Sequence, residues 1–263
     1  MKYALGNMLN GAGVRGLDAD ALAYITAVEV ADGQSLESAV KTAINRFIKG
    51  CKGDGIWDEM KASCILAGAR TLSGALVPLK GTLPTNFNFV SSDYSRTTGL
   101  KGNGSTKYIS SNRNNNADPQ NSRHLYAYLT GIDTTAVSNT WYIGSGFTNG
   151  GSYVAKNNAS GTIHIFRSSG GNLGRTVSGA VGGWGVGRSD SSNVLRLAAG
   201  SLDSIISASS FPANNVVGVF SATGGLNPTN ARISFYSIGE SLDFEAFDSR
   251  VSTLMSDLTA AIP

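Results

Sequence analysis

The side chains best suited to acid–base chemistry are three carboxylates near the C-terminus, Glu240, Asp243 and Glu245. Hydrolysis of a glycosidic bond ordinarily needs two carboxyl groups that face each other across a cleft. Carboxylates on one strand share a face only at even spacing, and Glu240 and Asp243 are three residues apart. Asp243 and Glu245 lie where the chain turns into a helical pattern, and acidic residues favour a helix N-terminus. We therefore expect these residues to cap a helix and not to catalyse.

The middle of the chain contains few carboxylates of any kind. From Met60 to Gly239 it has no glutamate, against fourteen lysines and arginines and twenty-five glycines. The aspartates of this segment are Asp93, Asp118, Asp133, Asp190 and Asp203. Most of them lie in turn-like settings. We therefore expect this segment to form a display surface and not an active site. The alternative is a carbohydrate-active enzyme, namely a depolymerase.

Nucleophilic, metal and cofactor chemistry finds little support in the sequence. The two histidines, His124 and His164, lie in expected strands and far from a nucleophile elbow, so no serine hydrolase triad is indicated. Cys51 and Cys64 lack zinc-ligand spacing; buried reduced thiols are expected, and a disulfide stays open. The glycine-rich segment 182–188 lacks the lysine of a phosphate loop and indicates a strand or loop with close backbone approach. We expect no metal, no cofactor and no catalytic residue.

The polar loop at residues 111–123 is the best candidate for contact with a partner. Its amide, guanidinium and hydroxyl groups can hydrogen-bond to sugar hydroxyls, and an aromatic face can stack on a sugar ring. The candidate contact residues are Arg113, Asn114, Asn115, Asn116, Arg123 and Trp184. The competing interpretation is that the asparagines shape turns and that the aromatic residues belong to the core. Because the arginines are scattered over many strands, sequence-specific binding of nucleic acid is not expected.

Charge is spread unevenly along the chain. Residues 1–59 carry net −2, residues 60–239 net +9 and residues 240–263 net −4, which gives the formal +3. A basic body favours an anionic partner, such as a surface glycan, nucleic acid or an acidic protein, although charge can also serve solubility alone. No apolar run has the form of a signal peptide or reaches the roughly 18 residues of a membrane helix. We therefore expect synthesis in the cytoplasm without a secretion signal, and no membrane contact.

Helical spacing dominates the first quarter of the chain. Residues 1–16 hold four glycines and are expected to form an extended arm. A first helix is expected from Leu17 until Gly33, and a second follows Ser35 as its cap. A third is expected from Asp54 through Ala67. Three short helices make a weak core, so they must pack on the following domain, on copies of themselves or on a larger assembly.

After Leu72 short β-like runs alternate with turn-forming clusters. The expected strands are 75–79, 87–90, 107–110, 124–129, 141–144, 153–155, 162–167, 194–198, 216–220 and 233–238. Helical spacing returns from Phe244 to Leu258. Many short strands without intervening helices indicate a mainly β fold, an antiparallel two-sheet sandwich, with a closed barrel as the alternative. The expected plan is an arm at 1–16, a helical anchoring region at 17–72 and a sandwich with a terminal helix at 73–263.

Several segments resemble virion proteins of tailed phages. The segment TGLKGNGSTKYI at 98–109 resembles the entry to concanavalin A-like or laminin G-like sandwich domains. The segment ARISFYSIGESL at 231–242 resembles the last strand and terminal helix of such domains in phage structural proteins. Similarity to a stretch that precedes the sandwich in those proteins is found at 31–37, 50–58 and 62–79. The resemblance covers residues 17–263 and implies a lectin-like jelly-roll sandwich in a virion component.

The resemblance also implies a function and a location. It implies a noncatalytic structural protein of the virion: a fibre, an appendage or a decoration of the head or tail. The implied partners are other virion proteins of the capsid, portal, neck or tail, and further copies of the chain as a homo-oligomer. The N-terminal region would attach to the particle, with the sandwich displayed outward. If the sandwich loops bind host-surface glycan, the protein is a host-receptor adhesin.

Overall fold

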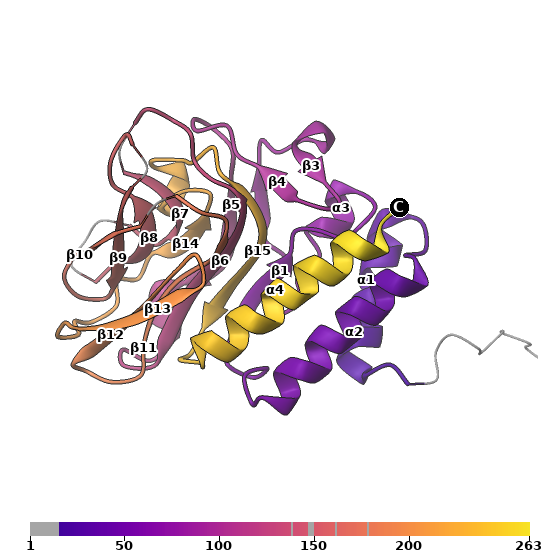
Figure 1. Ribbon diagram of the computed structural model, residues 1–263, viewed down its shortest axis with the longest axis horizontal. Helices are drawn as coiled ribbons and strands as arrows, with labels where there is room; N and C mark the ends of the chain where they lie inside the picture. Colours follow the sequence, from indigo (N-terminus) through magenta and orange to yellow (C-terminus); the bar gives the residue numbers. More distant parts are fainter. Residues whose placement is uncertain (1–15, 138, 147–149, 161, 178) are drawn as a thin grey trace, which may run out of the picture.

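The structure is a computed structural model that describes residues 16–137, 139–146, 150–160, 162–177 and 179–263. The expected arm lies outside the described residues except for Gly16. Within the described ranges the chain forms two antiparallel sheets, with three longer helices against one of them (Figure 1). The expected mainly β sandwich, preceded by helices and closed by a helix, is confirmed.

The two N-terminal helices form where helical spacing predicts them. Helix α1 (Ala19–Asp32) begins after Asp18, whose side chain accepts a hydrogen bond from the first turn, and ends at Gly33 in left-handed conformation. Helix α2 (Ser38–Gly53) presents an apolar stripe of buried residues that includes Phe47. Both helices therefore have a face that must be covered.

Two expectations for this region are wrong. The residue that precedes α2 is Glu37 and not Ser35. In place of the third helix, strand β1 (Met60–Ile65) pairs antiparallel with β15 (Arg232–Gly239). A short apolar run does not distinguish strand from helix by its periodicity, so the hydrogen bonds offered by the open edge of β15 decide its form. The first strand of the described residues thus lies beside the last.

Sheet A has the strand order β13-β12-β11-β6-β15-β4-β3, and β1 pairs with β15 outside this path. All its pairs are antiparallel. The further bounds are β3 (Tyr94–Ser95), β4 (Gly99–Lys101), β6 (Arg123–Gly131), β11 (Gly182–Arg188), β12 (Asn193–Ala198) and β13 (Ser201–Ile206).

Sheet B has the order β10-β9-β8-β7-β14-β5-β2, again with antiparallel pairs only. Its strands are β2 (Thr85–Phe87), β5 (Tyr108–Asn114), β7 (Thr140–Gly144), β8 (Ser152–Lys156), β9 (Ile163–Ser168), β10 (Leu173–Thr176) and β14 (Val216–Val219). Neighbours in both sheets are often distant in sequence, so the topology is built largely from crossovers between the sheets.

Most expected strands are found, with ends that differ by a few residues. The strand expected at 75–79 is wrong, because the short helix α3 (Leu72–Ala75) ends there and Pro78 lacks a backbone N–H for a ladder. The strand expected at 87–90 lies earlier, as β2. Strands β3, β4, β10 and β13 were not expected, because they are very short or carry little alternation.

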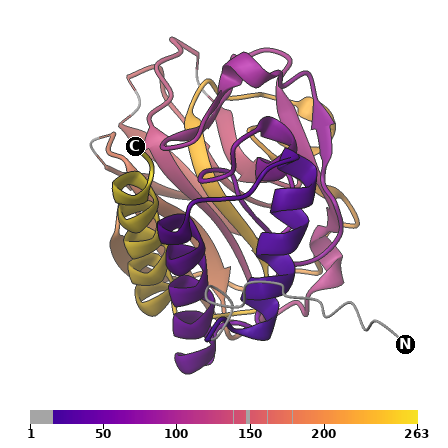
Figure 2. The same ribbon diagram turned by 90° about the vertical axis from the view of Figure 1, so that its right-hand side faces the viewer.

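Helices α1, α2 and α4 (Phe244–Ala261) cover the outer face of sheet A (Figure 2). Tyr126 of β6 and Phe235 of β15 point toward these helices, and their rings lie 4.9 and 5.9 Å from the ring of Phe247 on α4. A second core fills the space between the two sheets. The N-terminal helices therefore pack on the sandwich, which is the first of the three supports considered for them.

Strand β11 allows α4 to approach the sheet closely, as the glycine-rich segment predicts. A Cβ atom at Gly185 would lie 2.7 Å from the Phe244 ring, and one at Gly183 would collide with the Asp248 carboxylate. The Asp243 side chain accepts hydrogen bonds from the backbone N–H groups of Glu245 and Ala246, so the expected capping role is confirmed.

Candidate functional site

A surface groove of about 340 Å³ lies where the end of β5 meets β1. We call it the polar groove. Its lining residues are Lys61, Ala62, Gly81, Thr82, Asn112, Arg113, Asn114 and Ala117. Its volume falls within the roughly 300–1,000 Å³ of small-ligand sites. Arg113 and Asn114 belong to the loop that the sequence singles out, so the structure brings these two together.

Arg113 is fixed in the groove wall by a two-point contact. Its Nε and Nη2 donate to the Asp118 carboxylate at 3.1 and 2.5 Å. The Asp118 side chain is almost fully buried, whereas the Arg113 side chain keeps partial access to solvent. A bidentate pair of this kind gives the guanidinium a defined direction.

The asparagines of the groove are also held in place. Asn112 adopts a left-handed backbone conformation (φ 56°), and its amide donates to the Leu83 carbonyl at 2.9 Å. The Asn114 amide donates to the Asn214 side chain at 2.6 Å. The amides are therefore oriented before any ligand arrives, which lowers the entropy lost on binding.

Lys61 reaches the groove because β1 is a strand of sheet A. Its ammonium group lies 2.9 Å from the Glu240 carboxylate, and both side chains are partly exposed. Because the sequence predicted a helix over this segment, it could not identify Lys61 as a groove residue. The same is true of Thr82, which lies in the bend that follows the bridge between Lys80 and Ser63 of β1.

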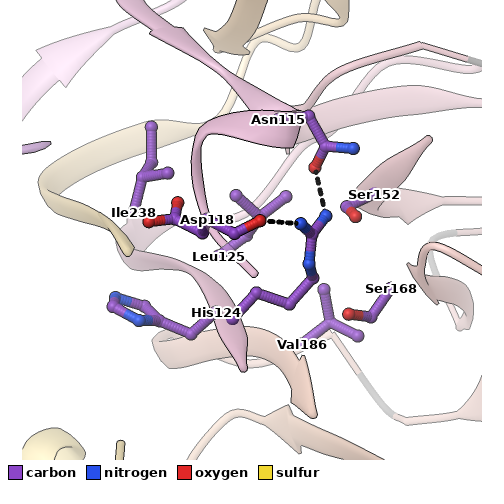
Figure 3. A pocket seen from close by; sticks show the side chains of 9 residues that line it. Asn115, Asp118, His124, Leu125, Ser152, Ser168, Val186 and Ile238 are labelled. Atoms are coloured by element: carbon purple, nitrogen blue, oxygen red, sulfur yellow. Dashed lines mark hydrogen bonds between the residues drawn. The ribbon is translucent and has the colours of Figure 1, made fainter. Parts of the chain in front are cut away.

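A small polar cavity of about 10 Å³ lies inside the sandwich near the groove. We call it the polar cavity. It is lined by Asn115, Asp118, Arg123, His124, Leu125, Ser152, Ser168, Val186 and Ile238 (Figure 3). Arg123 donates to the Asn115 side chain at 3.2 Å and to the Asp118 carbonyl at 2.7 Å, and these are the two dashed lines in Figure 3. Asp118 thus borders the cavity while its carboxylate binds Arg113 of the groove.

The other expected contact residues divide into exposed and buried ones. Asn116 is exposed, whereas Asn115 is buried and donates to the Gly150 carbonyl at 2.8 Å. Arg123 is buried in the polar cavity. Trp184 is 0% exposed between the sheets, and its indole N–H donates to Ala180. The burial of Asn115, Arg123 and Trp184 does not fit the expected surface contact, while contact by Arg113, Asn114 and Asn116 stays a prediction.

One exposed aromatic side chain at this end of the sandwich is Phe211, which is 86% exposed. It lies three residues before Asn214, the partner of Asn114 in the groove wall. No strand pattern surrounds Phe211, so the search for stacking faces among alternating strands missed it. The available signal was an aromatic residue in a segment rich in serine and asparagine, followed by Pro212.

Both histidines are interior residues, as the strand pattern indicates. Burial lowers the pKa of His124 and of His164 to about 4. The ring of His124 lies between the Glu240 carbonyl and the Ser237 hydroxyl, and that of His164 contacts the Tyr142 hydroxyl. Neutral imidazoles bound in this way have structural roles.

The two cysteines are free and buried, as expected. Burial raises the pKa of each thiol to about 12, so neither is a ready nucleophile. Cys64 lies on β1 and not on a helix, which corrects its expected setting. Among the described residues, no group of three or more histidine, cysteine, aspartate or glutamate side chains could hold a metal ion. In the same part of the chain, no helix has the length and apolarity needed to cross a membrane.

Each aspartate of residues 60–239 is engaged by a cation or by backbone N–H groups. The contacts are Asp93 with Lys107, Asp118 with Arg113, Asp133 with Lys156, Asp203 with Arg196, and Asp190 with the N–H groups of Ser192 and Asn193. Burial raises the pKa of Asp248, which belongs to α4 and accepts a hydrogen bond from Tyr126 of β6 at 2.6 Å. Each of these carboxylates therefore has a structural partner, and none of the contacts sets two carboxyl groups opposite each other.

Comparison with known proteins gives the fold class. The sequence matches no known protein family and no curated protein at a significant level. Among solved structures, a Trypanosoma rangeli sialidase in complex with 2,3-difluorosialic acid has a TM-score of 0.51 at 10% identity, covering 77% of this chain and 33% of its own. A botulinum neurotoxin type C structure, concerned with interaction with two ganglioside molecules, has a TM-score of 0.50 at 11% identity, covering 76% of this chain and 51% of its own. The chain thus spans about half of the neurotoxin chain and a third of the sialidase chain, and the likeness shows a shared β-sandwich fold.

Proposed function

We propose that the chain is a noncatalytic structural protein of a tailed-phage virion, displayed as a fibre, appendage or head or tail decoration, whose polar groove binds host-surface glycan. The observation that carries the glycan proposal is the groove itself. It combines preset amides, a guanidinium and an ammonium group on a sandwich surface. Sugar hydroxyls are bound by such fixed donors and acceptors. The virion setting rests on the sequence resemblance, with other virion proteins and further copies of the chain as partners.

The fold neighbours support a glycan as the class of ligand. The sialidase was solved with a sialic acid derivative, and the neurotoxin structure concerns gangliosides. Two proteins of very different sequence that contain this sandwich in part of their length are thus associated with glycans, although fold alone does not set function. The basic character of residues 60–239 favours an anionic glycan.

The engaged carboxylates support a noncatalytic role. A glycosidase ordinarily uses one carboxyl that donates a proton and a second that acts opposite it. Every aspartate and glutamate of the chain is among the described residues, and those of the sandwich are bound as given above. Glu240 pairs with Lys61, and Asp243 caps α4. The depolymerase alternative lacks a facing pair.

The test compares particle adsorption and binding of purified host polysaccharide for two groove variants, Lys61→Ala and Asn114→Ala. Each should weaken binding about fivefold, as expected for loss of one hydrogen bond worth about 1 kcal/mol. Lys49→Ala removes an equal charge from the exposed face of α2 and serves as the matched control. Equal binding by all variants across a salt series would contradict the groove, and release of shortened polysaccharide would favour the depolymerase.

A further inference from the structure

Two buried guanidinium groups at the end of the sandwich that holds the polar cavity have no anionic partner. Arg123 of β6 and Arg188 of β11 are 3% and 1% exposed. All aspartates and glutamates of the chain are described residues, and none has a carboxylate oxygen within 4.0 Å of a nitrogen of either group, although the backbone carbonyls of Asp118 and Asp190 accept hydrogen bonds from them. Buried charges in proteins are normally paired, because an unpaired charge loses its hydration without compensation.

The hydrogen bonds of Arg123 go to neutral acceptors. Nη1 donates to Ser169 Oγ at 2.9 Å and to Asn115, and Nη2 donates to the Asp118 carbonyl. Nε donates to the Pro119 carbonyl at 3.2 Å. Carbonyl and amide dipoles orient the guanidinium toward the cavity, but they leave its full charge in place.

Arg188 is less completely bonded. Its Nε donates to the Ser168 carbonyl at 2.8 Å and its Nη1 to the Ser207 carbonyl at 3.2 Å, whereas its buried Nη2 has no partner. The Ser168 hydroxyl, which is also buried and borders the polar cavity, has no partner either. Unsatisfied buried donors of this kind are few in native proteins and require an explanation.

The charge around the cavity is therefore positive. Arg113, Arg123 and Arg188 contribute three positive charges. The Asp118 carboxylate near the cavity is already bound by Arg113, and the exposed carboxyl of Asp190 lies near Arg188. His124 borders the cavity as a neutral ring, because burial lowers its pKa to about 4. Burial also lowers the pKa of Arg123 to about 10, so that group stays protonated at neutral pH.

We propose that the polar cavity binds one monatomic anion, chloride under ordinary conditions, through the Arg123 guanidinium and the Ser168 hydroxyl. The cavity volume of about 10 Å³ suits a single particle near the size of a water molecule and excludes a sulfate or a sugar carboxylate. Arg188 adds positive potential from its position against the Ser168 carbonyl. The anion would compensate charge that the chain leaves unpaired, independently of any glycan in the polar groove.

The first test is the midpoint of thermal unfolding in sodium chloride and in sodium gluconate at equal ionic strength. A specific anion should raise the midpoint by about 3–5 °C for each tenfold increase of chloride above its dissociation constant. Ser168→Ala should lose most of this chloride dependence, whereas Ser204→Ala, on the exposed face of β13, and the groove variant Lys61→Ala should keep it. If the cavity holds only water, Ser168→Ala removes an unsatisfied hydroxyl, and the midpoints in the two salts stay equal.

The second test locates the ion directly. Crystals grown with bromide should show an anomalous peak beside Ser168 and Arg123, and Ser168→Ala crystals should show a weaker one. Equal midpoints in chloride and gluconate together with no bromide peak in the cavity would overturn the proposal.

Discussion

The Asp118 carboxylate accepts two hydrogen bonds from Arg113, at 2.5 and 3.1 Å, across the wall that separates the polar groove from the polar cavity. The backbone carbonyl of Asp118 accepts a third, from Arg123 inside the cavity. One aspartate therefore orients a groove residue with its side chain and a buried residue with its main chain. The loop singled out by its polarity is a rigid support for the groove.

Arg113→Ala should destabilise the protein by about 3 kcal/mol, because it leaves a buried carboxylate without its cation. Urea unfolding followed by intrinsic fluorescence would measure this loss. Arg46→Ala breaks the exposed pair with Asp257 and should cost at most about 1 kcal/mol. Equal effects of the two variants would mean that the Asp118 carboxylate is solvated.

The stability of the protein should fall as the pH drops below about 6.5. The folded-state pKa of His124 and of His164 is about 4, below the usual 6.5, so the unfolded state takes up these protons first. Their contribution is fully present above about pH 6.5 and is lost as the pH falls toward 4. Each histidine contributes at most about 1.4 kcal/mol per pH unit to the slope of the unfolding free energy with pH.

Unfolding free energies between pH 7 and 5 would measure that slope, and the ring C–H chemical shifts would follow the two histidines directly. These shifts should stay constant in the folded protein throughout this range. Titration of either ring near pH 6.5 in the folded protein would contradict the buried neutral state.

Gly185→Ala should destabilise the protein by about 1–3 kcal/mol, because the new methyl group would lie 2.7 Å from the Phe244 ring and 3.1 Å from the Leu125 carbonyl. Thermal or urea unfolding would detect the change. Gly174→Ala, on the edge strand β10, is the matched control, because a Cβ atom there has nothing within 4 Å. If both variants are equally stable, α4 is not held tightly against β11.

The fold class could be predicted because the local signals were strong. Alternating runs such as Arg123–Gly131, now β6, and the capped apolar stripe of α4 depend on short-range periodicity alone. Strand β1 could not be predicted, since its form depends on pairing with β15, more than 160 residues later in the chain. Where the local spacing of apolar residues was ambiguous, pairing between distant strands decided the secondary structure.

The site could be predicted only in part. The composition of residues 111–123 marked Arg113 and Asn114, which do line the polar groove. It could not separate them from Arg123 and Asn115, because residue type does not tell which side chains of a loop turn inward. The stacking face was sought at Trp184, but a large aromatic residue in a strand that is covered on both faces is core.

Deleting residues 1–16 should abolish incorporation into particles and leave the fold unchanged. The described helices already pack on the sandwich, so attachment is assigned to the residues that precede them. The truncated chain still begins before Asp18, which caps α1 and binds Lys52, and its unfolding midpoint should match that of the full chain. The measurement is the amount of protein in purified particles assembled with each form, with Arg46→Ala as a control on the helical surface. Normal incorporation of the truncated chain would exclude residues 1–16 from the attachment proposal, and attachment would then be assigned to the exposed faces of α1 and α2.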